Sequence, residues 1–199
     1  MAGSAPRLGV LALQGDVREH LRALTELGAD AAPVRRPAEI ERIDGLVIPG
    51  GESSVIDKLS RTFGVADVII ARIADGLPVY GTCAGLILLA DRILDGIEGQ
   101  RTFGGLDVTV RRNAFGNQTR SFETDLDVPG LGDPPVHATF IRAPVVAEVG
   151  ERATAIASLA DGTVVAVQQG AVMGTSFHPE VTGELRFHRH LLRLVDAAR

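Results

Sequence analysis

The 199-residue sequence predicts an α/β fold, a three-layer sandwich with a mostly parallel central sheet flanked by helices and extended by added antiparallel strands. Two observations support this. In the first half, short apolar runs of strand length alternate with segments of helical periodicity, as in βαβ units. In the second half, stretches rich in β-branched residues follow one another with turn signals between them, as in antiparallel strands.

The first half opens with an unbroken apolar run at 8–13, typical of a strand buried on both faces. A helix with apolar residues at helical spacing should follow, with Asp16 and Glu19 as a capping box and Gly28 as its C-terminal cap. The same criteria then predict, in order, a strand, a helix, a strand and a helix at 45–49, 65–74, 78–81 and 83–91.

In the second half, Asp161-Gly162 is a hairpin turn signal between strand-like stretches. A final helix is predicted over 183–198. No repeat, low-complexity stretch or linker divides the chain, so residues 1–199 are expected to form a single domain. The β-rich stretches lie at 106–112, 121–128, 136–141 and 163–177.

Composition excludes several classes of protein. The net charge is −5 and no dense Lys/Arg run occurs, which argues against nucleic-acid binding. The N-terminal apolar run is too short for a signal sequence or a membrane span. A single cysteine cannot form an internal disulfide, which favours a reducing compartment. We therefore expect a cytoplasmic protein with no membrane association.

Three loops should meet at the carboxyl edge of the parallel sheet, where ligands bind in such folds. They follow the strands of the first half and carry the sequences LQGD, PGGESS and GTCAG, at 13–16, 49–54 and 81–85. This placement follows from the expected topology and makes that edge the candidate site.

Cys83 lies in GTCAG, between a strand and a helix. The flanking glycines are typical of a nucleophile elbow, a tight turn that presents a reactive side chain. A helix N-terminus also favours the thiolate form of a cysteine. The alternative is a small buried residue that only packs. The glycines and the strand–helix context favour the nucleophile.

A nucleophilic thiolate needs a histidine partner, which a third group orients. His178 follows a strand, and Glu180 lies two residues on, on the same side of an extended segment. A turn with a capping carboxylate is the alternative for this pair. The other histidines are less suitable: His188 and His190 lie among arginines in the last helix, where solvent exposure is expected, and His20 and His137 belong to a helix and a strand.

The PGGESS loop is either a turn before a helix capped by Ser53 or Ser54, or a ligand loop in which Gly50 and Gly51 bring N–H groups close to substrate. It lacks the Gly-Lys-Ser/Thr ending of a phosphate-binding loop. One cysteine and scattered histidines do not form a metal-ligand set, so neither a metal nor a cofactor is predicted.

Taken together, these motifs resemble the class I, triad-type glutamine amidotransferases, which have a flavodoxin-like α/β fold. More narrowly, they are similar to the glutaminase subunits of pyridoxal 5′-phosphate synthase. The motifs occur in the family's order and span the chain from Leu11 to Glu180: LALQGDVREH, IPGGES, GTCAGLILLA, RNAFGNQ, FIRAP and SFHPE.

The resemblance implies that Cys83 is the nucleophile, His178 the general base and acid, and Glu180 its orienting partner. It also implies a set of residues that bind L-glutamine, which carries both a carboxylate and an ammonium group: Gly51, Glu52, Ser53, Arg112, Ile141 and Arg142. Ala114 and Asn117 depart from the family's usual Ser and Arg and put in doubt only contacts beside Arg112.

The implied reaction is hydrolysis of glutamine to glutamate and ammonia through a thioester, with ammonia passed to a separate synthase subunit that makes pyridoxal 5′-phosphate (vitamin B6). Gly50, Gly51 and Gln14 are expected to form an oxyanion site that this partner activates. Three alternatives stay open: the glutaminase of another synthase, such as that of histidine biosynthesis; a thiol hydrolase of similar fold; and a non-catalytic subunit.

Overall fold

The computed structural model describes residues 4–112 and 121–199; Ala114 and Asn117 lie outside them. In chain order the elements are β1 (Arg7–Leu11), α1 (Val17–Glu26), β2 (Asp30–Val34), α2 (Pro37–Ile40), β3 (Gly45–Ile48), α3 (Ser53–Thr62), α4 (Val65–Ala74), β4 (Val79–Thr82), α5 (Ala84–Leu89), β5 (Ala90–Leu94), β6 (Leu106–Arg111), β7 (Phe122–Leu126), the 3₁₀ helix η1 (Pro129–Leu131), β8 (Val136–Phe140), β9 (Val145–Val149), β10 (Thr154–Ser158), β11 (Val164–Gln169), β12 (Val172–Thr175), α6 (Pro179–Thr182) and α7 (Arg186–Ala198).

The main sheet has the strand order β2-β1-β3-β4-β12-β11-β9-β6-β5, with β10 paired to β11. The neighbours from β2 to β12 are parallel. Beyond β12, strands β11, β9 and β6 pair antiparallel, and β7 and β8 form a separate two-stranded sheet. The predicted mostly parallel sheet with added antiparallel strands is confirmed.

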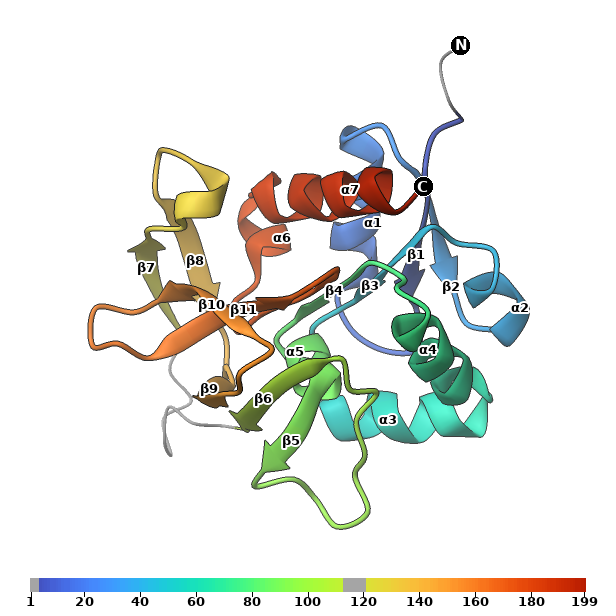
Figure 1. The fold of residues 1–199 in the computed structure, drawn as a ribbon, viewed down its shortest axis with the longest axis horizontal. Coiled ribbons are helices and arrows are strands. Elements are labelled where there is room, and N and C mark those ends of the chain that lie inside the picture. The colour runs from blue at the N-terminus through green and yellow to red at the C-terminus, as the bar shows by residue number, and fades with distance from the viewer. Residues whose placement is uncertain (1–3, 113–120) are drawn as a thin grey trace.

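Helices cover both faces of the parallel part (Figure 1), with α1 and α7 on one face and α3, α4 and α5 on the other. Each face has its own apolar core, because alternate residues of a strand point to opposite sides. Leu46 and Ile48 of β3 belong to the core beneath α3, α4 and α5, and Val47 between them belongs to the core beneath α1 and α7. This double burial explains the continuous apolar runs of β1 and β3.

Each predicted element overlaps an observed one with shifted boundaries, but the stretch at 163–177 forms two strands, β11 and β12, and the strands β2, β5, β9 and β10 were not predicted. The helix predicted at 83–91 is shorter, because it ends at Leu89 and the chain continues at once into β5. The Phe103 N–H donates to the Leu88 carbonyl there at 2.6 Å, which satisfies one carbonyl at the end of α5. Gly28 has a φ of +84° directly after α1, as predicted for a C-terminal cap. Among the residues that the structure describes, no helix is long and apolar enough to cross a membrane.

Candidate active site

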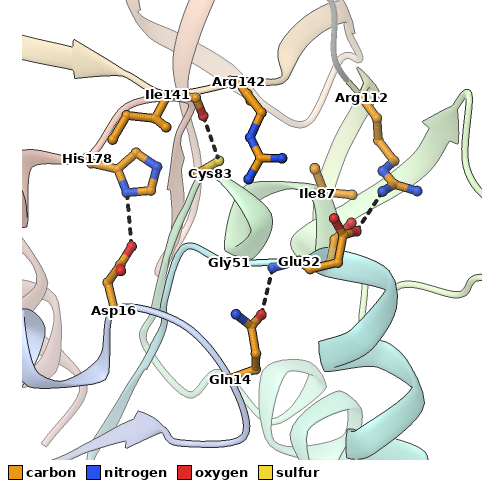
Figure 2. A pocket seen from close by; sticks show the side chains of 11 residues that line it. Gln14, Asp16, Gly51, Glu52, Cys83, Ile87, Arg112, Ile141, Arg142 and His178 are labelled. Atoms are coloured by element: carbon orange, nitrogen blue, oxygen red, sulfur yellow. Dashed lines mark hydrogen bonds and ion pairs between the residues drawn. The ribbon is translucent and has the colours of Figure 1, made fainter. Parts of the chain in front are cut away.

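A pocket of about 320 Å³ lies at the carboxyl edge of the parallel strands, where the three predicted loops meet (Figure 2). Most of the predicted site residues line it, and so do two residues that the sequence analysis did not select, Asp16 and Ile87. The predicted residues on its wall are Gln14, Gly51, Glu52, Ser53, Cys83, Arg112, Ile141, Arg142 and His178.

Cys83 occupies a strained turn between β4 and α5. Its φ of 49° and ψ of −98° lie outside the regions that L-residues favour, and its side chain is mostly buried. The glycines on either side permit the turn: a Cβ on Gly81 would overlap the Gly85 backbone, and a Cβ on Gly85 would overlap the Ile48 carbonyl. Strand and helix therefore pack backbone to backbone around the cysteine, as in a nucleophile elbow.

The position of Cys83 is fixed by pairing between β4 and β12. Thr82 and Thr175 are register partners in this parallel pair, and the Cys83 N–H donates to the Thr175 carbonyl at 2.7 Å. The chain leaving β12 reaches His178 three residues later, where the His178 N–H donates to the Thr139 carbonyl at 3.0 Å. These two backbone hydrogen bonds thus bring the two side chains to one pocket.

His178 Nδ1 hydrogen-bonds Glu180 Oε1 at 2.8 Å, and the Glu180 side chain is fully buried. We expected this pairing on the premise that residues 178–180 are extended. That premise is wrong, because residues 179–182 form the helical turn α6, with Pro179 as its first residue. The i and i+2 side chains meet because His178 precedes the turn and Glu180 lies in it.

Electrostatics favour a charged imidazole beside a charged carboxylate. Burial opposes the charged form of His178, but hydrogen bonds with Cys83 and Glu180 outweigh it and raise its pKa to about 10. Burial likewise opposes ionisation of Glu180, but His20 and His178 hold its pKa well below the usual range. Glu180 is therefore an anion that stabilises protonated His178.

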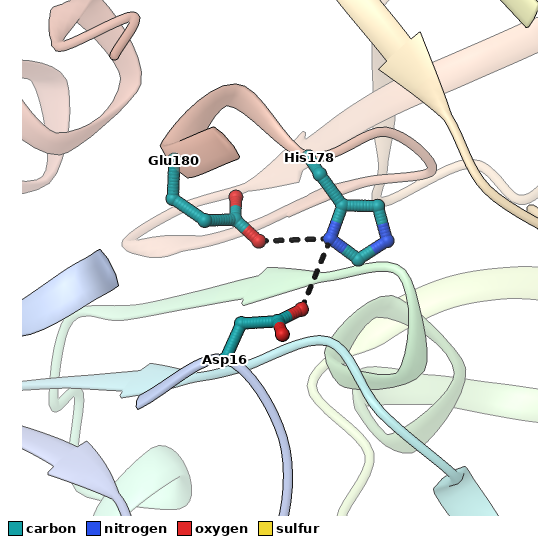
Figure 3. A group of neighbouring side chains, drawn as sticks. All are labelled: Asp16, His178 and Glu180. Atoms are coloured by element: carbon teal, nitrogen blue, oxygen red, sulfur yellow. Dashed lines mark hydrogen bonds and ion pairs between the residues drawn. The ribbon is translucent and has the colours of Figure 1, made fainter. Parts of the chain in front are cut away.

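Asp16 is a second carboxylate on the same nitrogen (Figure 3): its Oδ2 lies 3.5 Å from His178 Nδ1. The predicted capping box is wrong, since the Asp16 side chain makes no cap hydrogen bond to α1. Burial raises the pKa of Asp16, and His178 counteracts part of the effect. We assign no metal to these three side chains, because the hydrogen bond to Glu180 already occupies Nδ1.

A charged wall faces the cysteine across the pocket. Arg112 Nη2 lies 2.8 Å from Glu52 Oε1 and its Nη1 donates to Gln100 at 2.8 Å, which fixes the guanidinium. Arg142 points into the pocket (Figure 2) and makes no ion pair with any residue that the structure describes. The wall thus offers a cation for a carboxylate and an anion for an ammonium group.

Glu52 also begins α3. As the N-cap it accepts a hydrogen bond from the Ser54 N–H, so the alternative in which Ser53 or Ser54 caps this helix is wrong. Ser53 is buried and accepts a hydrogen bond from Gln100 at 3.0 Å. The carbonyl of Ile141 lies 4.0 Å from the Cys83 sulfur, which closes the opposite side of the pocket.

The Gly50-Gly51 segment lies between the histidine and the first loop. A Cβ on Gly50 would overlap the His178 ring, and a Cβ on Gly51 would overlap the Gln14 amide. The Gly50 carbonyl accepts a hydrogen bond from the Asp16 N–H at 3.2 Å. Gln14 Oε1 accepts from the Glu52 N–H at 2.7 Å, one peptide beyond the Gly50-Gly51 peptide that the sequence analysis favoured.

Two buried histidines were missed. His20 and His188 are fully buried in contact with each other, so the predicted solvent exposure of His188 is wrong. His190 is half-buried and hydrogen-bonds Gln168. The helical period contained the signal: Phe187, His188, Leu191 and Val195 form the buried face of α7, and the neighbouring arginines lie on the other.

A cysteine elbow beside a histidine–glutamate pair, at the carboxyl edge of a mostly parallel sheet, defines the class I glutamine amidotransferase arrangement. The chain belongs to the SNO glutamine amidotransferase family, whose model matches residues 10–197.

Relatives match over nearly the full length. The chain is 68% identical over 196 residues to a protein of Clavibacter michiganensis named pyridoxal 5′-phosphate synthase subunit PdxT, covering 98% of this chain and 94% of that one. A protein of the same name from Leifsonia xyli is 67% identical, with 96% of each chain covered. A solved structure described as a glutamine amidotransferase is 47% identical with a TM-score of 0.88, covering 95% of this chain and 98% of that one.

Proposed function

We propose that this chain, acting as one domain, hydrolyses L-glutamine to L-glutamate and ammonia with a Cys83–His178–Glu180 triad. The observation that supports this best is the strained Cys83 turn, in the same pocket as a His178 that is held by buried Glu180. A thiolate beside an imidazolium is the reactive state of such a pair.

In the first half of the reaction, the Cys83 thiolate attacks the side-chain amide carbon of glutamine. The carbonyl oxygen becomes an oxyanion, for which the Gly51 N–H is the proposed donor. When the C–N bond breaks, His178 gives its proton to the leaving nitrogen and ammonia departs. The product on the enzyme is a glutamyl thioester.

In the second half, neutral His178 takes a proton from water, and the resulting hydroxide attacks the thioester carbon. The C–S bond breaks, glutamate leaves and the thiolate–imidazolium pair is restored. Glu180 orients the imidazole in both halves and stabilises its charged form. Arg112 or Arg142 would hold the α-carboxylate of glutamine, and Glu52 its ammonium group.

The ammonia is proposed to pass to the synthase subunit of a pyridoxal 5′-phosphate synthase, in agreement with the name of the relatives. We further propose that this partner activates the chain through the loop at 14–16. That loop makes a hydrogen bond on each side of the Gly50-Gly51 peptide. The Asp16 N–H donates to the Gly50 carbonyl, and Gln14 Oε1 accepts from the Glu52 N–H. A partner that moves it would change the orientation of the Gly50-Gly51 peptide.

The triad is tested by glutamate release in the presence of a synthase subunit. His178→Asn should lower kcat by about 10³ or more, and Glu180→Gln should lower it less, because Glu180 moves no proton. His190→Asn, a substitution of a half-buried histidine outside the pocket, is the matched control. A His178→Asn enzyme as active as the control would contradict the triad.

The partner is tested with the wild-type chain. Glutamine should support pyridoxal 5′-phosphate formation only when both subunits are present. The synthase should raise glutaminase turnover by about 10² to 10³, the factor by which kcat falls when an enzyme loses one oxyanion-hole donor. Glutamine must also be preferred to simple esters, which a general thiol hydrolase would accept. Equal turnover with and without saturating synthase would refute the activation.

A further inference from the structure

The carboxylate of Glu180 lies between two imidazole rings. Its Oε1 is 2.8 Å from His178 Nδ1 and 3.5 Å from His20 Nε2, and the side chains of Glu180 and His20 are fully buried. Oε2 has no hydrogen-bond partner among the residues that the structure describes. His20 is thus the second polar group, after His178, that faces this buried anion.

The protonation of His20 follows from its neighbours. His20 Nε2 is 3.2 Å from Thr82 Oγ1, and its Nδ1 is 2.8 Å from His188 Nε2. A proton on Nε2 lets His20 donate to Thr82 Oγ1 and turns a positive hydrogen toward Glu180 Oε1, whereas an unprotonated Nε2 would turn a lone pair toward the carboxylate in a site without water contact. His20 Nδ1 and His188 Nε2 share one hydrogen bond, and either nitrogen can be its donor without changing the state of His20 Nε2.

Charged and titratable groups face His20 from α6, α7 and β4 and from the residue that precedes α1. Glu180 comes from α6, His188 from α7 and Tyr80 from β4, whose ring meets His20 edge-on with 6.4 Å between centroids. Asp16, just before α1, is close enough to interact electrostatically with His20. Burial and the nearby His20 lower the pKa of His188 to about 3, so His188 is neutral. The charged group in direct contact with His20 is therefore Glu180, at 3.5 Å from Nε2.

We propose that His20 is a positioning residue for the triad: its Nε2–H holds Glu180 Oε1 in place, so that the carboxylate stays aligned with His178 Nδ1. Nothing in this role requires His20 to touch glutamine, and His20 is not among the residues that line the pocket. This inference rests on the proposed function, because it assigns His20 an effect on the same reaction.

Two substitutions of similar volume separate hydrogen bonding from packing. His20→Gln keeps a side-chain N–H donor and His20→Leu removes it. Loss of this N–H contact with a buried carboxylate should lower kcat of His20→Leu about 10- to 100-fold with little change in KM, and His20→Gln should recover most of that loss. The acid limb of the pH profile should move to higher pH in His20→Leu, since Glu180 then binds a proton more readily.

His190→Leu, on the same helix as His188 but outside this cluster, is the matched control. Equal losses in His20→Leu and His20→Gln, or an unmoved acid limb, would overturn the proposal in favour of simple packing. Wild-type glutamate release in the same assay tests the proposed function separately, because it involves no substitution at His20.

A wild-type measurement covers the case in which His20→Leu does not fold. In ¹⁵N-labelled protein at pH 7, the Nε2 signal of His20 should be that of a protonated nitrogen, and it should shift in Glu180→Gln. A His20 ring with unprotonated Nε2 would overturn the assignment.

Discussion

Replacing Gly85 with alanine should disable the site although it adds only one methyl group. The new Cβ would overlap the Ile48 carbonyl oxygen and lie 3.1 Å from its carbon. Ordinary carbon–carbon contacts are ~3.5–4.0 Å, so α5 must retreat from β3 by roughly 1 Å. Cys83 lies directly before α5 and moves with it.

A displacement of ~1 Å at a reacting group can lower the rate about 10²-fold. Overpacking of this kind also costs about 1–3 kcal/mol, more than the ~1 kcal/mol that Gly→Ala gains in an unconstrained helix. We therefore expect Gly85→Ala to be less stable than wild type and to have about 1% of its kcat.

Glutamate release with synthase present and thermal unfolding followed by circular dichroism measure the two effects. Gly130→Ala is the matched control, since nothing lies within 4 Å of a Cβ at that position. If Gly85→Ala keeps kcat within about twofold of the control, the backbone contact between α5 and β3 does not position the nucleophile, and the reasoning is wrong.

Three further predictions concern single side chains. Cys83→Ala should release no glutamate yet unfold cooperatively, and labelling by a glutamine-like electrophile should disappear with it; residual turnover would exclude Cys83 as the nucleophile. Arg112→Gln should raise KM for glutamine about tenfold or more, whereas Arg111→Gln, an exposed neighbour paired with Asp95, should not; equal KM values would refute substrate binding by Arg112. His188 has a lowered pKa in the folded state, so the unfolded chain binds a proton that the folded chain does not between pH 6.5 and about 3. Stability should therefore fall on acidification by up to about 1.4 kcal/mol per pH unit, and His188→Gln should make this fall shallower in urea titrations; an unchanged slope would show that His188 is not buried in its neutral form.

The sequence predicts those strands best that are covered on both faces. β3 is apolar throughout, and β1 is apolar after the exposed Arg7, because each side packs against a helical layer. β2 was missed because it is an edge strand, where Pro33 is tolerated and most side chains reach solvent. Its pairing with β1 depends on the rest of the sheet, which local pattern does not reveal.

The sequence predicts those site residues that lie in a recognisable local motif. It predicts less well those residues whose role depends on contacts made only in the folded chain. Cys83 and His178 stand out through their local motifs. Asp16 has the sequence context of a helix cap, and only the approach of α6 directs it to His178 instead. His20 ends the motif LALQGDVREH, but nothing in that motif predicts its contacts, because they are with residues more than 60 positions away.

The register between β4 and β12 aligns the end of the strand before Cys83 with the end of the strand that leads to His178, whatever the length of distant loops. A slip of one residue would displace one partner by ~3.3 Å and turn its side chain to the opposite face, so the pairing admits a single productive alignment. The segment 127–135, which joins β7 to β8, contributes no residue to the pocket, whereas Gln100 of the segment 95–105 holds Arg112. A change in the length or composition of 127–135 would therefore alter the surface offered to a partner while the reacting atoms keep their spacing.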